Sequence, residues 1–199
     1  MRWRIAAGAL AVWLCAAADG EHPLLRPIHD VDVTYALDAG GGTTLHERLR
    51  WRAAAQVLRL DPPTADLYVI IDLAARRTST VRTAERTVIE MAAPDNVTGV
   101  PDSAAAAAVR RGTDTVAGLA CTEWDMTDAA GEAARLCLTA DGVLLRARSG
   151  ARTLLSAETV ENGPLAADLF QVPAGYAHRS MDPKPAGPQP LSPQPLRPK

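Results

Sequence analysis

Aromatic side chains are scarce in this sequence. They make up 4% of the 199 residues, and only one of them is phenylalanine. Alanine supplies much of the apolar composition instead, which indicates a core built from small and aliphatic side chains. The formal net charge is −2, and this disfavours a nucleic-acid-binding protein, because such domains are strongly basic. No apolar run reaches the roughly 18 residues that a membrane-spanning helix needs.

The motifs of common enzyme classes are also missing. The sequence has no Gly-x-Ser-x-Gly elbow, no Walker loop, no His-Glu-x-x-His helix and no Cys-x-x-Cys pair. The histidines His22, His29, His46 and His178 are scattered along the chain. His46 precedes Glu47 directly, and neighbours on a strand point to opposite faces, so these two do not form an acid–base pair. The sequence predicts no catalytic residue, no metal site, no cofactor and no enzyme activity.

The N-terminus has the pattern of a secretory signal peptide. Arg2 and Arg4 precede an apolar run over residues 5–14, and the small residues 16–18 form a cleavage site. We therefore expect residues 1–18 to be removed on export to the periplasm. Lipidation at Cys15 is the alternative, but bulky residues stand directly before it, which disfavours a membrane-anchored lipoprotein.

Two cysteines remain after this cleavage, Cys121 and Cys137. An even number in an exported protein predicts a disulfide bond, and zinc is disfavoured because no histidine lies near either cysteine. Placing the two cysteines directly opposite each other centres a hairpin on Ala129, inside a glycine-containing turn. That register joins strands 116–126 and 134–140 and brings Glu123 opposite Arg135.

Asp141-Gly142 is a second hairpin signal. It places Leu138 opposite Leu145 and Cys137 opposite Arg146. The three strands then form a meander with one apolar face, which holds Trp124 and Leu138, and one charged face with the disulfide. Leu144 breaks the alternation.

Alternating or continuous apolar patterns predict further strands on both sides of this meander. They cover residues 29–38, 44–52, 57–60, 67–73, 78–83, 86–91 and 151–160. A short helix is expected over 104–110 and a helical turn over 165–170. We expect one domain over residues 19–178 and a proline-rich, disordered tail over 179–199.

The strand over residues 44–52 separates two kinds of side chain. Leu49 and Trp51 point inward, and Arg48, Arg50 and Arg52 point outward. The arginines form either a solvated face or a contact surface for lipid headgroups or an acidic partner. Glu47 breaks the inward pattern.

Four short motifs in this order carry a family resemblance. They are Asp-Leu-Tyr-Val-Ile-Ile-Asp at 66–72, Val-Ala-Gly-Leu-Ala-Cys at 116–121, Leu-Cys-Leu at 136–138 and Leu-Phe-Gln-Val-Pro-Ala-Gly-Tyr at 169–176. Over residues 28–177 the chain resembles uncharacterised bacterial envelope proteins related to the lipoprotein-carrier (LolA/LolB-like) superfamily. The resemblance implies a mainly β (α+β) fold, in which a strongly bent antiparallel sheet forms a half-open barrel with one or two short helices on its concave face.

Carriers of that kind hold acyl chains in the concave face, so the resemblance implies a ligand-binding role for inward residues. The candidates are Tyr35, Leu49, Trp51, Tyr68, Trp124 and Leu138. Ordinary core packing is the alternative for each of them.

We therefore expect a non-enzymatic periplasmic protein that binds a lipid or acyl chain. The alternative is an envelope protein that docks on a protein partner through a sheet edge or its proline-rich tail. The oligomeric state is left open.

Overall fold

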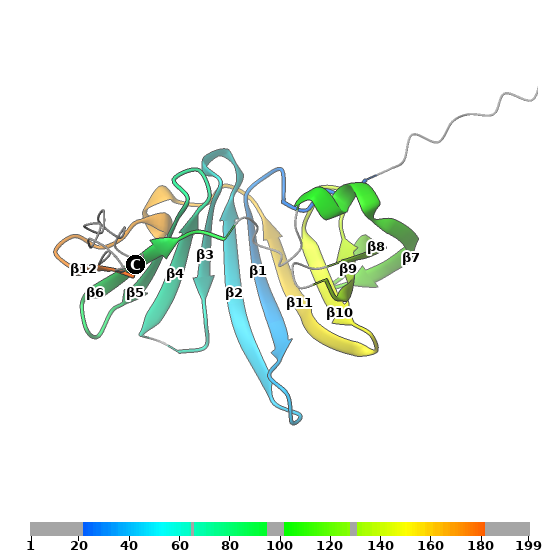
Figure 1. The fold of residues 1–199 in the computed structure, drawn as a ribbon, viewed down its shortest axis with the longest axis horizontal. Helices are drawn as coiled ribbons and strands as arrows, with labels where there is room; N and C mark the ends of the chain where they lie inside the picture. Colours follow the sequence, from blue (N-terminus) through cyan, green and yellow to red (C-terminus); the bar gives the residue numbers. More distant parts are fainter. Residues whose placement is uncertain (1–21, 65, 95–101, 128–130, 182–199) are drawn as a thin grey trace, which may run out of the picture.

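The computed structural model describes residues 22–64, 66–94, 102–127 and 131–181. The predicted signal peptide, the residues 128–130 around the expected hairpin centre and residues 182–199 of the tail lie outside the described residues. The described chain forms one twelve-stranded sheet that is strongly curved and not closed (Figure 1). The predicted fold class is confirmed.

The strands follow the predicted ranges closely, with two additions, β7 and β12. They are β1 (Val31–Asp38), β2 (Thr44–Arg52), β3 (Val57–Asp61), β4 (Leu67–Asp72), β5 (Arg77–Arg82), β6 (Thr87–Ala92), β7 (Val109–Val116), β8 (Leu119–Thr127), β9 (Ala133–Leu138), β10 (Leu144–Ser149), β11 (Arg152–Asn162) and β12 (Ala177–Ser180). The described helices are short 3₁₀ turns, η1 (Ala53–Ala55), η2 (Asp102–Ala107) and η3 (Ala167–Phe170).

The order across the sheet is β12-β6-β5-β4-β3-β2-β1-β11-β10-β9-β8-β7. All neighbours are antiparallel except β12, which runs parallel to β6. Figure 1 shows the strands lined up along the long axis of the molecule, with β12 and β7 at its two ends. Because β12 continues to Ser180, it crosses the expected boundary between domain and tail at residue 178.

One face of the sheet carries the larger part of the apolar core. In the central register Val33 lies opposite Leu49, and Trp51 lies between Val31 and Leu58. We call this the pocket face. Val31, Val33 and Trp51 are buried there, as the alternation of the sequence predicts.

On the opposite face, charged side chains from the central strands pair with one another. Arg48 donates two hydrogen bonds of 2.7 Å to the buried carboxylate of Asp32, and Arg50 bridges Asp32 and Asp61. Only 12% of the Arg50 side chain is exposed. Two of the three arginines of the predicted stripe are therefore held by ion pairs within the sheet.

The chain after β11 covers the opposite face at the far end of the sheet. Phe170, Val172 and Tyr176 pack against buried residues of β3 to β6. Arg59 anchors this segment by donating to the Leu169 carbonyl oxygen at 2.8 Å. Strand β4 is consequently covered on both faces, which explains its continuous apolar sequence.

The disulfide between Cys121 and Cys137 is confirmed, with the two Cα atoms 5.4 Å apart. The predicted register of β8 and β9 is wrong by two residues, because Glu123 lies opposite Cys137 and Asp125 lies opposite Arg135. In this register Arg135 donates to Asp125 at 2.6 Å. A shift of two residues keeps each side chain on the same face of the sheet. Cys121 and Cys137 are therefore diagonal neighbours, and the twist of the sheet lets them form the disulfide.

The helix expected over 104–110 is also wrong in extent. Only the 3₁₀ helix η2 forms, and β7 begins at Val109. Ala117 and Gly118 have φ angles of 51° and 77°, so they form a two-residue turn with positive φ at both positions that pairs β7 with β8. The turn reverses the alternation and places Val116 on the face of Cys121, whereas the sequence predicted it beside Trp124.

The register of β9 and β10 is correct at one end. Cys137 lies opposite Arg146 as predicted, but Leu138 pairs with Leu144 rather than Leu145. A β-bulge between Leu144 and Arg146 accounts for the difference. The broken alternation at Leu144 was the signal of this bulge.

We predict that the variant Cys121→Ala/Cys137→Ala loses about 3 kcal/mol of unfolding free energy, because the unfolded chain loses the constraint of the closed loop. Urea denaturation followed by circular dichroism measures this difference. Wild-type protein unfolded with a reductant is the control and should show a similar loss. An unchanged unfolding free energy in both would contradict a structural role for the bond.

Candidate functional site

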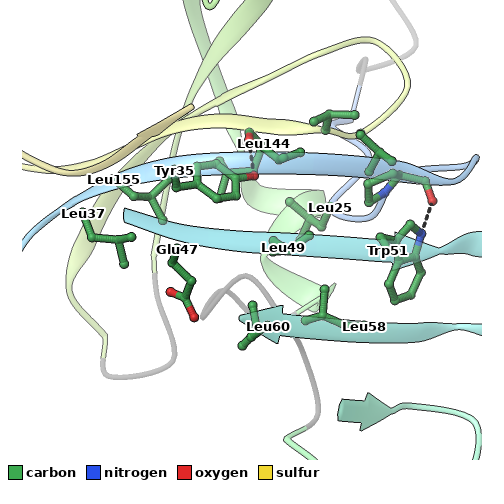
Figure 2. A pocket seen from close by; sticks show the side chains of 15 residues that line it. Leu25, Tyr35, Leu37, Glu47, Leu49, Trp51, Leu58, Leu60, Leu144 and Leu155 are labelled. Atoms are coloured by element: carbon green, nitrogen blue, oxygen red, sulfur yellow. Dashed lines mark hydrogen bonds between the residues drawn. The ribbon is translucent and has the colours of Figure 1, made fainter. Parts of the chain in front are cut away.

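An apolar pocket of about 200 Å³ lies on the pocket face of the central strands (Figure 2). Its walls come from β1, β2, β3, β10 and β11, from the segment before β1, and from the turn that leads into β10. The lining residues are Leu25, Pro27, Val31, Val33, Tyr35, Leu37, Glu47, Leu49, Trp51, Leu58, Leu60, Gly142, Val143, Leu144 and Leu155.

Two aromatic residues in the wall have their polar atoms satisfied by the protein. The Tyr35 hydroxyl donates to the Leu144 carbonyl oxygen at 2.6 Å, and the Trp51 indole N–H donates to the Pro27 carbonyl oxygen at 2.9 Å (Figure 2). Burial raises the pKa of the Tyr35 phenol above its ordinary value, so this hydroxyl remains a donor at neutral pH. The two rings therefore present apolar surface to the pocket.

The segment before β1 is fastened across the turn between β9 and β10. The Ile28 backbone N–H donates to the Asp141 carbonyl oxygen at 3.1 Å, and His29 contacts the Asp141 carboxylate at 3.0 Å. A Cβ atom at Gly142, which has a φ of +89°, would overlap the carbonyl group of Arg26. This close approach needs glycine and seats the buried Leu25 beside the pocket.

Glu47 is the one carboxylate among the residues that line the pocket. It lies opposite Tyr35 in the register of β1 and β2, on the same side of β2 as Leu49 and Trp51 (Figure 2). Within the described residues no hydrogen bond or ion pair holds its side chain. Burial, and secondarily the negative charge of Asp61, raises the pKa of the Glu47 carboxyl above its ordinary value.

The six predicted cavity residues separate into three groups. Tyr35, Leu49 and Trp51 line the pocket together. Trp124 and Leu138 pack in a separate cluster with Leu136, against the alanines of η2. These two are not part of the pocket wall.

Tyr68 lies on the opposite face of the sheet, which corrects its expected inward position. Its ring stacks under the Arg59 guanidinium at 3.9 Å and packs against the segment that contains Phe170. The alternation of side chains could not assign Tyr68 to one face of the sheet, because β4 is apolar on both faces.

The sequence analysis missed several residues of the pocket wall. Leu25 and Pro27 precede the first strand and have no periodicity that would reveal their position. Glu47 and Leu144 did leave a signal, because each interrupts the alternation of its strand. A break of alternation beside predicted core residues therefore marked two parts of this wall.

Two further properties concern the described residues as a whole. No group of three or more histidine, cysteine, aspartate or glutamate side chains among them has a geometry that could hold a metal ion. None of the helices in residues 22–64, 66–94, 102–127 and 131–181 has the length and hydropathy of a membrane span.

No protein-family model and no curated protein matches this chain. Several solved structures share its fold. An uncharacterised conserved protein from Thermus thermophilus is 13% identical with a TM-score of 0.55, and the match covers 77% of this chain and 91% of that chain. PNGF-II is 12% identical with a TM-score of 0.50, over 77% of this chain and 31% of that chain.

A chain in the Pseudomonas aeruginosa MucA/MucB complex is 17% identical with a TM-score of 0.50. The match covers 73% of this chain and 56% of that one, so the chain spans just over half the length of this neighbour. At these identities the likeness concerns the fold alone.

We predict that Gly142→Ala destabilises the protein more than Gly118→Ala. Both positions have positive φ and share a cost of about 1–2 kcal/mol for a side chain there. Only the Cβ at position 142 also displaces the carbonyl of Arg26, whereas the space around Gly118 is open. Denaturant unfolding measures the unfolding free energy of the two variants. Equal losses would contradict the close packing of the segment before β1 against Gly142.

We predict that Glu47→Gln stabilises the protein at neutral pH. The folded protein holds the Glu47 proton more tightly than the unfolded chain, so wild-type stability falls as pH rises from the ordinary value of 4.5 through the raised folded value. Glutamine removes this loss. The gain in unfolding free energy should be present at about pH 7.5 and vanish near about pH 4, and a gain independent of pH would contradict the prediction.

Proposed function

We propose that this protein binds a small apolar group, such as the end of an acyl chain, in the pocket beneath Trp51. The observation that supports this is a pocket with an apolar lining in which the hydroxyl of Tyr35 and the indole N–H of Trp51 already have partners. A ligand would bury apolar surface there without leaving these polar atoms unpaired.

The size of the pocket limits the ligand. Its volume of about 200 Å³ is below the roughly 300–1,000 Å³ typical of sites for drug-sized molecules. One chain end or one small ring fits this volume better than a whole two-chain lipid. Burial contributes about 25 cal/mol per Å² before the costs of ordering, so the expected affinity is moderate.

The bacterial envelope is the proposed location. The signal-peptide pattern at residues 1–18 directs export, and a disulfide between Cys121 and Cys137 persists in an oxidising compartment. A chain in the Pseudomonas aeruginosa MucA/MucB complex has a similar fold. We propose a binding role without catalysis, because no histidine, serine or cysteine lines the pocket beside its single carboxylate.

A protein partner is the second candidate function. Strand β7 is an edge strand that is paired only with β8 in the described sheet, and most of its residues are exposed. Edge strands of this kind can extend their sheet with a segment of another protein. The structural neighbour in the MucA/MucB complex supports this alternative at the level of fold.

Native mass spectrometry of protein from periplasmic extract, with organic extraction of bound molecules, tests the first candidate. We expect an apolar species that dissociates on denaturation. The neutral probe n-octanol should also bind the emptied protein, and Leu49→Trp should weaken this binding at least about tenfold by filling the pocket. Calorimetry measures the affinity.

Leu45→Trp is the matched control, because Leu45 lies on the same strand, is exposed, and does not line the pocket. It should bind n-octanol as the wild type does. Absence of both a co-purified species and octanol binding would contradict the pocket function and favour the protein partner. Deleting residues 182–199, which leaves β12 intact, would then test the tail as the docking segment.

A further inference from the structure

Glu47 occupies a position that the fold does not explain. Alternation places its side chain on the apolar pocket face of β2, in line with Leu49 and Trp51. It is half-buried, and no hydrogen bond or ion pair joins it to another described residue. A carboxylate that is partly removed from water without a partner costs stability.

The surroundings of Glu47 are suited to a cation. None of the residues that line the pocket has a basic side chain, so the wall offers no internal counter-ion. The neighbouring carboxylate of Asp61 adds negative potential, although its own charge is balanced by Arg50 and Arg59 on the opposite face. The hydroxyl of Tyr35, which lies opposite Glu47, donates its hydrogen bond to the Leu144 carbonyl oxygen.

Along β2, the pocket wall runs from the carboxylate of Glu47 to the ring of Trp51. From Glu47 to Trp51 the strand advances by about 13 Å, and apolar side chains of β1, β2 and β3 line this path. A bound molecule that places a charged group at Glu47 therefore has apolar wall along the rest of its length.

We propose that the pocket takes an apolar chain that ends in a primary ammonium group, with the Glu47 carboxylate as its counter-ion. This inference rests on the proposed function and names the class of ligand. A charge-assisted hydrogen bond in a partly desolvated site favours the ammonium group. A carboxylate head on the same chain meets a like charge and is disfavoured.

Three probes with the same chain test the head-group preference: n-octylamine, n-octanol and n-octanoate, each titrated by calorimetry at about pH 7.5. The wild type should bind n-octylamine at least about tenfold more tightly than n-octanoate, with n-octanol between them. Glu47→Gln should reduce the affinity for n-octylamine relative to that for n-octanol at least about fivefold. Glu47→Asp should retain part of the preference.

Glu85→Gln is the control, because Glu85 is an exposed glutamate that pairs with Arg82 outside the pocket. It should behave as the wild type with all three probes. If no probe binds the wild type, the proposed function itself fails. If the three bind equally, or if Glu47→Gln keeps the preference for the amine, the pocket function stands and the role of Glu47 is overturned.

Discussion

A sheet without a second layer has to cover its own apolar face, and this constraint governs the described structure. Twelve strands exceed the number that usually stays open without curling, and the described helices are only short 3₁₀ turns. Curvature brings the side chains of β1, β2 and β3 toward one another and leaves an apolar hollow. The segment around Leu25 and the turn at Gly142 close one side of this hollow, so the pocket results from incomplete self-coverage.

The opposite face is covered by other means in different regions. Around β1 to β3, the ion pairs of Arg48 and Arg50 with Asp32 and Asp61 replace an apolar layer. Toward β6, the segment after β11 supplies Phe170 and Tyr176 as apolar cover. The protein therefore shields this face with ion pairs near the centre and with its own chain near the edge. Tyr68 belongs to that second region, which separates it from the pocket.

The pocket combines a stabilising wall with one destabilising group. Tyr35 and Trp51 satisfy their polar atoms and pack tightly, whereas Glu47 remains half-buried without a partner. Residues that lower stability are common where a site is built for a ligand, because the ligand supplies the missing interaction. The contrast between these neighbours is the physical basis of both the proposed function and the proposed ligand class.

The sequence by itself determined most strands, the pairing of Cys121 with Cys137 and the inward position of Trp51, because two-residue alternation and cysteine number are local properties. Tertiary structure decided the register of β8 and β9, the extra hairpin at Ala117 and the separation of Tyr68 from the pocket. A shift of two residues preserves every face, so alternation cannot detect it. The sequence of a strand that is apolar on both faces does not show on which face a residue such as Tyr68 lies. The segments that pack on each face come from distant parts of the chain.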